Sequence, residues 1–296
     1  MNQSPDLSPV FAAAERVMGK TAPNPPVAAG AYDAQGSLLG VAAHQGAGLP
    51  HAERNLLDKA RREGWIDKIH TLYTTLEPCH HHGRTPPCTH MIVAEKIPRV
   101  LYGVRDPNPE AAGGADFLKE NGVDVEGDVG AEEACISLAP FLHKVKTGLP
   151  FVVVKSAHRT DGGMIPPPGA KTFTSQKDLT AAHILRRQSD AIITGSGTVL
   201  ADHPLFTVRH VADHPGKKRH VVILDRRRRV PQDYLAALAG NGLVPHIADD
   251  FDAALRYLAD QGCLQVLVEA GPTLLSTIES RGCWQKWVRF YEENPK

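Results

Sequence analysis

The sequence predicts an α/β fold divided into two domains. Strand-like apolar segments alternate with segments whose apolar residues have helical spacing, and this alternation is typical of layered α/β domains. The chain has 296 residues, which is enough for two domains of ordinary size. The alternation begins a second time after residues 146–149. We therefore place the domains at residues 1–147 and 148–296, and we find no internal repeat that relates them.

Composition and charge narrow the function classes. Thirty-three basic residues balance 33 acidic ones, so no overall positive field favours nucleic acid or an anionic membrane. No apolar run reaches the length of a membrane helix, and the N-terminal residues lack the features of a signal peptide, so we expect a cytoplasmic protein with a small-molecule partner. Two basic runs, "KKRH" at 217–220 and "RRRR" at 226–229, fit solvated turns as well as ligand contacts.

The first domain is expected to begin with a helix and a hairpin. Apolar spacing predicts a helix over residues 6–19, and "DAQG" predicts the turn between two strands within residues 27–43. Residues 51–65 have an apolar period near 3.6, so His51 stands at the start of a helix. Further elements are expected at residues 69–79 (strand), 88–96 (helix), 99–107 (strand), 114–125 (helix leading into a strand) and 130–145 (helix).

The second domain is expected to repeat this alternation. Strands are predicted at residues 151–157, 190–195, 219–225 and 263–271, and helices at residues 178–189 and 251–262. The segment "EAGPTL" at 269–274 follows a strand and precedes a helix, so it predicts a tight turn that presents backbone N–H groups to a phosphate.

A cluster of histidines and cysteines predicts a metal site in the first domain. The five cysteines are an odd, scattered set, which argues against a disulfide framework and leaves metal binding as the best use of the close pair Cys79 and Cys88. Catalytic zinc takes three protein ligands and keeps one position for water. His51, Cys79 and Cys88 supply such a set, and both thiolates lie where an element ends or begins.

Glu53 is the predicted catalytic residue. It lies two residues after His51, so its carboxylate is placed to carry a proton from a zinc-activated water to a departing amine. "HAE" and "PC" match the signature of zinc deaminases, although eight residues rather than two separate the cysteines. The alternative is a structural zinc site that is closed by a fourth ligand, His80, His81 or His82.

The long motif "TLEPCHHHGRTPPC", with "PNPPV", "GAGLPHAE" and "DPNP", strongly resembles the deaminase half of the bifunctional deaminase/reductase of riboflavin biosynthesis. The resemblance implies a cytidine-deaminase-like three-layer α/β/α domain that binds Zn²⁺ and deaminates a diaminohydroxy-phosphoribosylamino-pyrimidine. It implies substrate contacts for four residues: Asn24, His44, His81 and Arg84. Ala28 and Ala29 replace the usual Gly-Cys, and the added methyl of Ala28 either crowds the pocket floor or is absorbed in the strand.

The second domain resembles the reductase half of the same family, on the segments "FVVVKSA", "LRRQSDAIITGSGTVLADHPLFTVR" and "VLVEAGPTLLST". The resemblance implies a dihydrofolate-reductase-like α/β fold, NADPH as cofactor and reduction of the ribosyl group to a ribityl chain. It implies cofactor contacts for Ala157, Thr198, Asp202, Gly271, Pro272 and Thr273. It implies substrate contacts for Lys155, Arg186, Arg209 and Glu269, with Lys155 and Asp202 near the hydride acceptor.

This half departs from the family in several places. "HRTDGG", "MIPPPGAK" and "TFT" at 172–174 replace the usual segments, and the family normally continues for several strands beyond "CWQKWVRFYEENPK". We therefore expect reduced, altered or absent reductase activity, and a sheet with an exposed edge. Two alternatives stay open. One is a deaminase of free cytidine or tRNA, and the other is a deaminase whose second half serves only for assembly. A homo-oligomer is expected.

Overall fold

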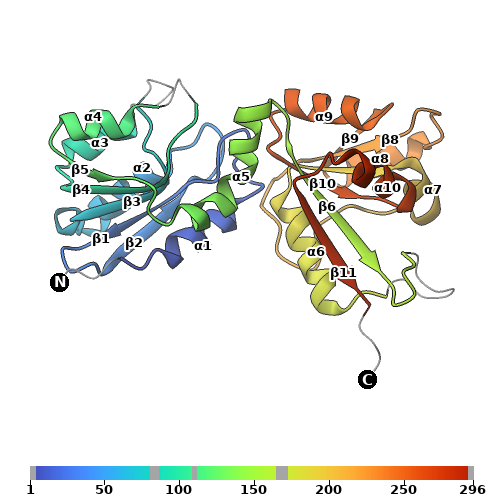
Figure 1. Ribbon diagram of the computed structural model, residues 1–296, viewed down its shortest axis with the longest axis horizontal. Helices are drawn as coiled ribbons and strands as arrows, with labels where there is room; N and C mark the ends of the chain where they lie inside the picture. The colour runs from blue at the N-terminus through green and yellow to red at the C-terminus, as the bar shows by residue number, and fades with distance from the viewer. Residues whose placement is uncertain (1–4, 81–86, 109–111, 165–172, 293–296) are drawn as a thin grey trace. The chain divides into compact units, whose positions relative to one another are not determined.

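The computed structural model describes residues 5–80, 87–108, 112–164 and 173–292 (Figure 1). It divides into two compact units, Met1–Lys146 and Thr147–Lys296. Within the described ranges, none of the helices has the length and apolar character required to cross a membrane.

The first unit is built on a five-stranded sheet with the order β2-β1-β3-β4-β5. β1 pairs antiparallel with β2 and β3, whereas β3, β4 and β5 run parallel, so the predicted hairpin is confirmed. The strands are β1 (Ala28–Tyr32), β2 (Leu38–Ala43), β3 (Thr71–Leu76), β4 (Arg99–Val104) and β5 (Asp124–Glu126). The helices are α1 (Ser8–Val17), α2 (Ala52–Glu63), the short 3-10 helix η1 (Ile66–Lys68), α3 (Cys88–Ala94), α4 (Gly114–Glu120) and α5 (Ala131–Thr147).

Helices cover both faces of this sheet. α2, α3 and α4 bury Leu56, Ile92 and Leu118 against one face. α1 buries Val10 against the other face, where α5 adds Leu138. The predicted three-layer α/β/α arrangement is therefore confirmed, and it arises because each helix has one apolar stripe to bury.

The second unit is built on a six-stranded, fully parallel sheet with the order β11-β6-β10-β7-β8-β9. Its central strands are continuous apolar runs, as expected for strands that are covered on both faces. The strands are β6 (Phe151–His158), β7 (Ala191–Gly195), β8 (Arg219–Leu224), β9 (Leu243–Ala248), β10 (Gln265–Glu269) and β11 (Lys286–Tyr291). The helices are α6 (Gln176–Gln188), α7 (Ser196–Asp202), α8 (Gln232–Gly240), α9 (Phe251–Asp260) and α10 (Pro272–Arg281).

This unit also has three layers. α9 and α10 pack against one face of the sheet through residues such as Leu258 and Ile278. α7 and α8 bury Val199 and Leu238 against the opposite face. The α/β architecture expected for the second domain is confirmed, and β11 occupies the sheet edge beside β6. Tyr291 of β11 is 62 % exposed.

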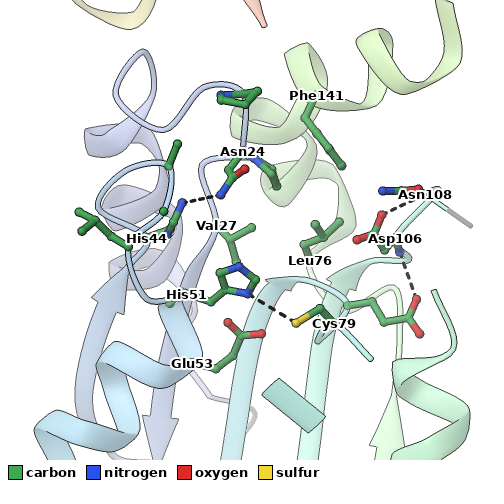
Figure 2. Close-up of a pocket in the computed structure, with 17 residues that line it drawn as sticks. Asn24, Val27, His44, His51, Glu53, Leu76, Cys79, Asp106, Asn108 and Phe141 are labelled. Atoms are coloured by element: carbon green, nitrogen blue, oxygen red, sulfur yellow. Dashed lines mark hydrogen bonds between the residues drawn. The ribbon is translucent and has the colours of Figure 1, made fainter. Parts of the chain in front are cut away.

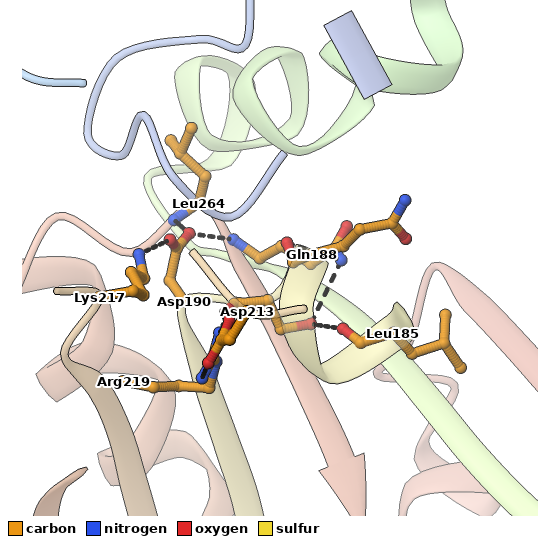
Figure 3. Close-up of polar contacts among 9 residues, drawn as sticks. Leu185, Gln188, Asp190, Asp213, Lys217, Arg219 and Leu264 are labelled. Atoms are coloured by element: carbon orange, nitrogen blue, oxygen red, sulfur yellow. Dashed lines mark hydrogen bonds and ion pairs between the residues drawn. The ribbon is translucent and has the colours of Figure 1, made fainter. Parts of the chain in front are cut away.

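A buried polar network fixes the amino ends of the central strands (Figure 3). The Asp190 carboxylate accepts the backbone N–H groups of Leu264 and Gln265 at 2.9 and 3.1 Å, and Lys217 Nζ donates to it at 2.7 Å. Nearby, the buried Arg219 guanidinium donates to Ser189 O at 3.0 Å and also binds a carboxylate, that of Asp213. These contacts satisfy the buried charges and hold β7, β8 and β10 together at their amino ends. The carboxyl ends of these strands are free of this network and are available to a ligand.

Candidate active sites

The three predicted metal ligands come together at one end of the first sheet. His51 is the N-cap residue of α2, Cys79 follows β3, and Cys88 is the first residue of α3. His51 Nδ1 lies 3.5 Å from the Sγ atoms of both cysteines, and the three ligand atoms all lie within 4.8 Å of one another. Usual zinc bond lengths put the nitrogen and sulfur atoms of a tetrahedral site roughly 3.5 Å apart. The cluster therefore fits a zinc ion.

The charges in this cluster favour the thiolate form of Cys79, whereas the hydrogen bond with Cys79 raises the pKa of the Cys88 thiol well above its ordinary value. Hydrogen bonds from Cys88 and His51 outweigh burial and lower the pKa of Cys79 to about 4. The hydrogen bond with Cys79 raises the pKa of His51 to about 9. A cysteine thiolate is the nucleophilic and metal-binding form, so Cys79 is prepared for the ion at neutral pH.

Glu53 lies beside this cluster and is 3 % exposed. Burial and the charge of Cys79 raise the pKa of its carboxyl to about 7. A group with a pKa near the working pH is able both to accept and to release a proton. Figure 2 shows Glu53 next to His51, below a cavity of about 590 Å³ that both residues line.

One wall of this cavity carries the two predicted residues Asn24 and His44. His44 Nδ1 lies 3.0 Å from Pro50 O, and its Nε2 atom lies 3.1 Å from Asn24 Nδ2. Because a carbonyl only accepts, Nδ1 carries the proton and Nε2 accepts from the Asn24 amide. Burial lowers the pKa of His44, which favours this neutral form. The arrangement leaves the Asn24 amide oxygen to accept a hydrogen bond from a ligand.

The opposite wall contains residues that sequence reasoning did not assign. Asp106, Asn108 and Phe141 line the cavity. The fully buried side chain of Glu77 holds this wall in place, because it accepts the backbone N–H groups of Asp106 at 3.1 Å and Ala115 at 2.9 Å. The motif "DPNP" after a strand was a usable signal for the first two residues, whereas nothing in the sequence indicated Phe141 of α5.

Two sequence expectations about this pocket are resolved by the fold. Ala28 and Ala29 are fully buried in β1, in the cores on opposite faces of the sheet, so the added methyl of Ala28 is absorbed in the strand and does not line the cavity. His80 packs on Phe117 with ring centroids 4.2 Å apart and lies 3.0 Å from Thr89 Oγ1, outside the metal cluster. His81, His82 and Arg84 lie outside the described residues.

The second unit has its own cavity, of about 1230 Å³, at the carboxyl ends of β6, β10, β7 and β8. Nine of the predicted residues line it: Lys155, Ala157, Arg186, Thr198, Asp202, Glu269, Gly271, Pro272 and Thr273. Thr198 Oγ1 of α7 accepts the Gly271 N–H at 3.1 Å, which joins α7 to the turn after β10. Phe173 of the "TFT" segment also lines the cavity, so this departure from the family still places an aromatic side chain there.

The two arginines that were expected to contact substrate have different surroundings in this unit. Arg186 makes a bidentate ion pair with Glu269, with N···O distances of 2.5 and 2.7 Å. Burial alone raises the pKa of Glu269, but the guanidinium of Arg186 lowers it to about 2. The charge of Arg186 is therefore already matched before any phosphate binds. Arg209 is exposed, donates to Thr207 Oγ1 at 3.1 Å, and is not among the described residues that line the cavity.

Comparison with known proteins identifies the two units separately. Residues 7–104 match the cytidine and deoxycytidylate deaminase zinc-binding region, and residues 150–291 match the RibD C-terminal domain. The riboflavin biosynthesis protein RibD of Aquifex aeolicus is 33% identical over 302 residues, which cover 94% of this chain and 83% of the relative. RibD of Escherichia coli is 40% identical over 198 residues, which cover 66% of this chain and 53% of that relative.

Solved structures agree over almost the whole chain. RibD of Acinetobacter baumannii, form 1, has a TM-score of 0.82 and 30% identity, and the match covers 98% of this chain and 86% of that one. A diaminohydroxyphosphoribosylaminopyrimidine deaminase/5-amino-6-(5-phosphoribosylamino)uracil reductase of Thermotoga maritima has a TM-score of 0.82 and 29% identity, covering 96% and 85%.

A zinc-binding deaminase region that precedes a reductase domain in one chain defines the class: a bifunctional deaminase and reductase. The matches to the RibD relatives extend over both units of this chain, in the same order along the sequence. The chain belongs to the RibD family of riboflavin biosynthesis proteins. Its activities are those of a deaminase and a reductase, with Zn²⁺ and NADPH as cofactors.

Proposed function

We propose that the first unit deaminates 2,5-diamino-6-(5-phosphoribosylamino)pyrimidin-4-one and that the second unit reduces the ribosyl group of the product to a ribityl chain. The observation that carries the proposal is the cluster of His51, Cys79 and Cys88 beside buried Glu53 at one cavity. A His-Cys-Cys set with a neighbouring carboxylate is the set that zinc deaminases use.

The roles of the first-unit residues follow from their positions. When bound to His51, Cys79 and Cys88, zinc supplies an activated water nucleophile near neutral pH. Glu53 takes a proton from this water and delivers it to the departing amine, because its pKa of about 7 permits both transfers. The water oxygen adds to the ring carbon that carries the amine, the exocyclic C–N bond breaks, ammonia leaves with the proton that Glu53 delivers, and a carbonyl remains on the ring. Asn24 and Asp106 bind the ring from opposite walls of the cavity.

The second unit is proposed to carry out the hydride transfer. Lys155 on β6 and Glu269 on β10 are register partners, so they place a cation and a carboxylate side by side in the cavity for the substrate. α10 begins at Pro272, and the backbone N–H of Thr273 in its first turn is offered to a phosphate of NADPH, since the Gly271 N–H is bound by Thr198 Oγ1 and Pro272 has no N–H. NADPH held there would supply a hydride to C1 of the ribosylamino group; the C1–O bond of the sugar ring would break, its oxygen would take up a proton, and NADP⁺ would remain.

The assembled second cavity supports a working reductase rather than an assembly module. Nine predicted residues and Phe173 surround a space large enough for cofactor and substrate together. The reduced reductase activity expected from the sequence departures stays a prediction, as do the homo-oligomeric state and the cytoplasmic location.

The direct test follows two signals in one sample. Zinc-loaded protein is incubated with the pyrimidine phosphate, with and without NADPH, while ammonia release and NADPH absorbance are recorded. The proposal predicts ammonia in both samples and NADPH oxidation that depends on deamination. Turnover of free cytidine without turnover of the pyrimidine phosphate contradicts the substrate. Ammonia release without any NADPH oxidation contradicts the reductase role.

A further inference from the structure

A buried histidine of α6, His183, binds a segment of the chain that borders the second cavity. His183 is 4% exposed, and its Nδ1 accepts the backbone N–H of Arg209 at 2.9 Å. Because Nδ1 accepts, the ring proton is on Nε2 and the imidazole is neutral. Burial and the nearby cation of Arg186 lower the pKa of His183 to about 4, which agrees with a neutral ring at pH 7.

The segment that His183 binds is held by side chains. The described residues 203–209 form neither helix nor strand, so regular structure does not supply partners for their backbone groups. Three side chains supply such partners instead: Tyr234 Oη donates to Pro204 O at 2.5 Å, Arg186 Nη1 donates to Thr207 O at 3.0 Å, and His183 Nδ1 accepts the Arg209 N–H at 2.9 Å. The segment is thereby fixed at its start, its middle and its end.

The same contacts impose an unusual backbone conformation inside the segment. Phe206 is 1% exposed, lines the cavity and has a φ of 54°, in the left-handed region. A phenylalanine adopts this region where the surrounding structure imposes it. His183 and Arg186 are three residues apart on α6, so they share one face of the helix and carry two of the three backbone contacts.

Arg209 carries the positive charge that this segment offers to a ligand. Its side chain is exposed, and its Nη1 donates to the neutral Thr207 Oγ1 at 3.1 Å. Arg186, by contrast, already pairs with the carboxylate of Glu269. A guanidinium binds phosphate through a planar fork of donors, so an arginine that is not paired in this way is the better partner for an anionic substrate.

We propose that His183 is a positioning residue for the reductase step. By accepting the Arg209 N–H, it holds this arginine where the guanidinium binds the phosphate of the deaminated pyrimidine. The inference rests on the proposed reductase function and adds a residue that acts through another one. His183 is not among the described residues that line the cavity. Its effect should therefore appear in KM for the pyrimidine phosphate and not in KM for NADPH.

The experiment compares wild-type protein with H183L, H183N, R209A and the double variant H183L/R209A. Leucine removes the acceptor, whereas the Oδ1 of asparagine is as many bonds from Cβ as Nδ1 is and can still accept the N–H. H210L is the matched control, because His210 is exposed and packs on His183 with ring centroids 4.6 Å apart. Steady-state kinetics give kcat and KM for both substrates, and inhibition by ribose 5-phosphate reports the phosphate contact.

H183L is expected to raise KM for the pyrimidine phosphate, and the inhibition constant of ribose 5-phosphate, by about 10-fold. Its kcat and its KM for NADPH should stay within about two-fold of wild type, which also shows that the second unit is folded. H183N should recover most of the loss, and H210L should behave as wild type. The double variant should have the KM of R209A, because no arginine remains to be positioned.

Several results overturn the inference. An unchanged KM for the pyrimidine phosphate in folded H183L means that His183 does not position Arg209. If the effects of H183L and R209A multiply in the double variant, the two residues act independently. Where H183L does not fold, H183M takes its place, since methionine is apolar and adapts to the available space.

Failure of the proposed function itself gives a different result. If wild-type protein does not oxidise NADPH on the deaminated pyrimidine phosphate, the reductase function fails and the inference fails with it. Wild-type turnover combined with an unchanged KM in H183L contradicts the inference alone.

Discussion

At the scale of single residues, two buried glutamates show how a neighbouring charged side chain sets the pKa of a carboxyl group. Glu53 and Glu269 are the same residue type, and burial raises the pKa of both. Glu53 lies near the thiolate of Cys79, which adds to burial and raises its pKa to about 7. Glu269 faces Arg186, which outweighs burial and lowers its pKa to about 2. The first glutamate is therefore suited to proton transfer, and the second is a permanent anion.

The Arg186–Glu269 pair predicts a defined dependence of stability on pH. The folded pKa of Glu269 is about 2 against an ordinary value of 4.5, so the ionised form stabilises the fold above pH 4.5. This contribution is lost as the pH falls from 4.5 towards 2. One pKa unit corresponds to about 1.4 kcal/mol, which gives a stabilisation of about 3 kcal/mol at neutral pH.

E269Q is therefore expected to lower the free energy of unfolding by about 3 kcal/mol at pH 7. The difference from wild type should shrink as the pH is lowered to 3. Urea denaturation at the two pH values, followed by tryptophan fluorescence, measures both quantities. A difference that is independent of pH would contradict the ion pair as its cause.

At the scale of elements, the zinc loop depends on a close approach of α4. A Cβ atom on Gly114, the first residue of α4, would lie 1.8 Å from the carbonyl oxygen of Pro78, which precedes the ligand Cys79. Only glycine permits this contact, so the packing of α4 and the position of the ligand loop are linked.

G114A is expected to lower the free energy of unfolding and to weaken zinc binding. Overpacking of this kind typically costs about 1–3 kcal/mol, which exceeds the gain of up to about 1 kcal/mol that alanine brings to a helix. Urea denaturation and competition with a chelator measure the two effects. K119A, at an exposed position of the same helix, serves as control. Wild-type zinc affinity in G114A would show that α4 does not position the loop.

The elements that the sequence predicted well are those with a strong local pattern. The helix that begins at His51 and the helix that begins at Cys88 both appear as expected, because an apolar stripe marks each one. β9 was missed because Pro245 interrupts its pattern, and proline is tolerated there since β9 is an edge strand. α7, α8 and β11 were missed as well.

The candidate sites were predictable to the extent that their residues are close in sequence. His51 and Glu53 are two positions apart, and Cys79 and Cys88 share one motif. The pairing of Arg186 with Glu269 joins residues 83 positions apart, and only the register of the parallel sheet brings them together. The same reason explains why Asp106 and Asn108 were quoted but not assigned, and why Phe141 was not anticipated.

At the scale of the whole molecule, each unit has its own core, sheet and cavity. The metal ligands all belong to the first unit, and the described residues of the second unit contain no comparable cluster of metal-binding side chains. Loss of zinc should therefore abolish the deaminase activity of the first unit and leave the reductase activity of the second unit unchanged.

Removal of zinc with a chelator is expected to abolish ammonia release from the pyrimidine phosphate. NADPH oxidation on the already deaminated product is expected to remain within about two-fold, since no step of it uses the metal site. Parallel assays before and after chelation, and after zinc is restored, check this outcome. Equal loss of both activities would contradict the independence of the two sites.

The role of Glu53 beside the zinc site is decided by ammonia release from wild-type protein and E53Q, with the zinc content determined in the same samples. We expect about one zinc ion per chain in both proteins, and a fall in the deamination rate of E53Q by a factor of about 10² to 10⁴, the usual effect of losing a general acid-base group. Deamination by zinc-loaded E53Q at the wild-type rate would contradict this role, because the buried carboxylate would then have no part in moving the proton.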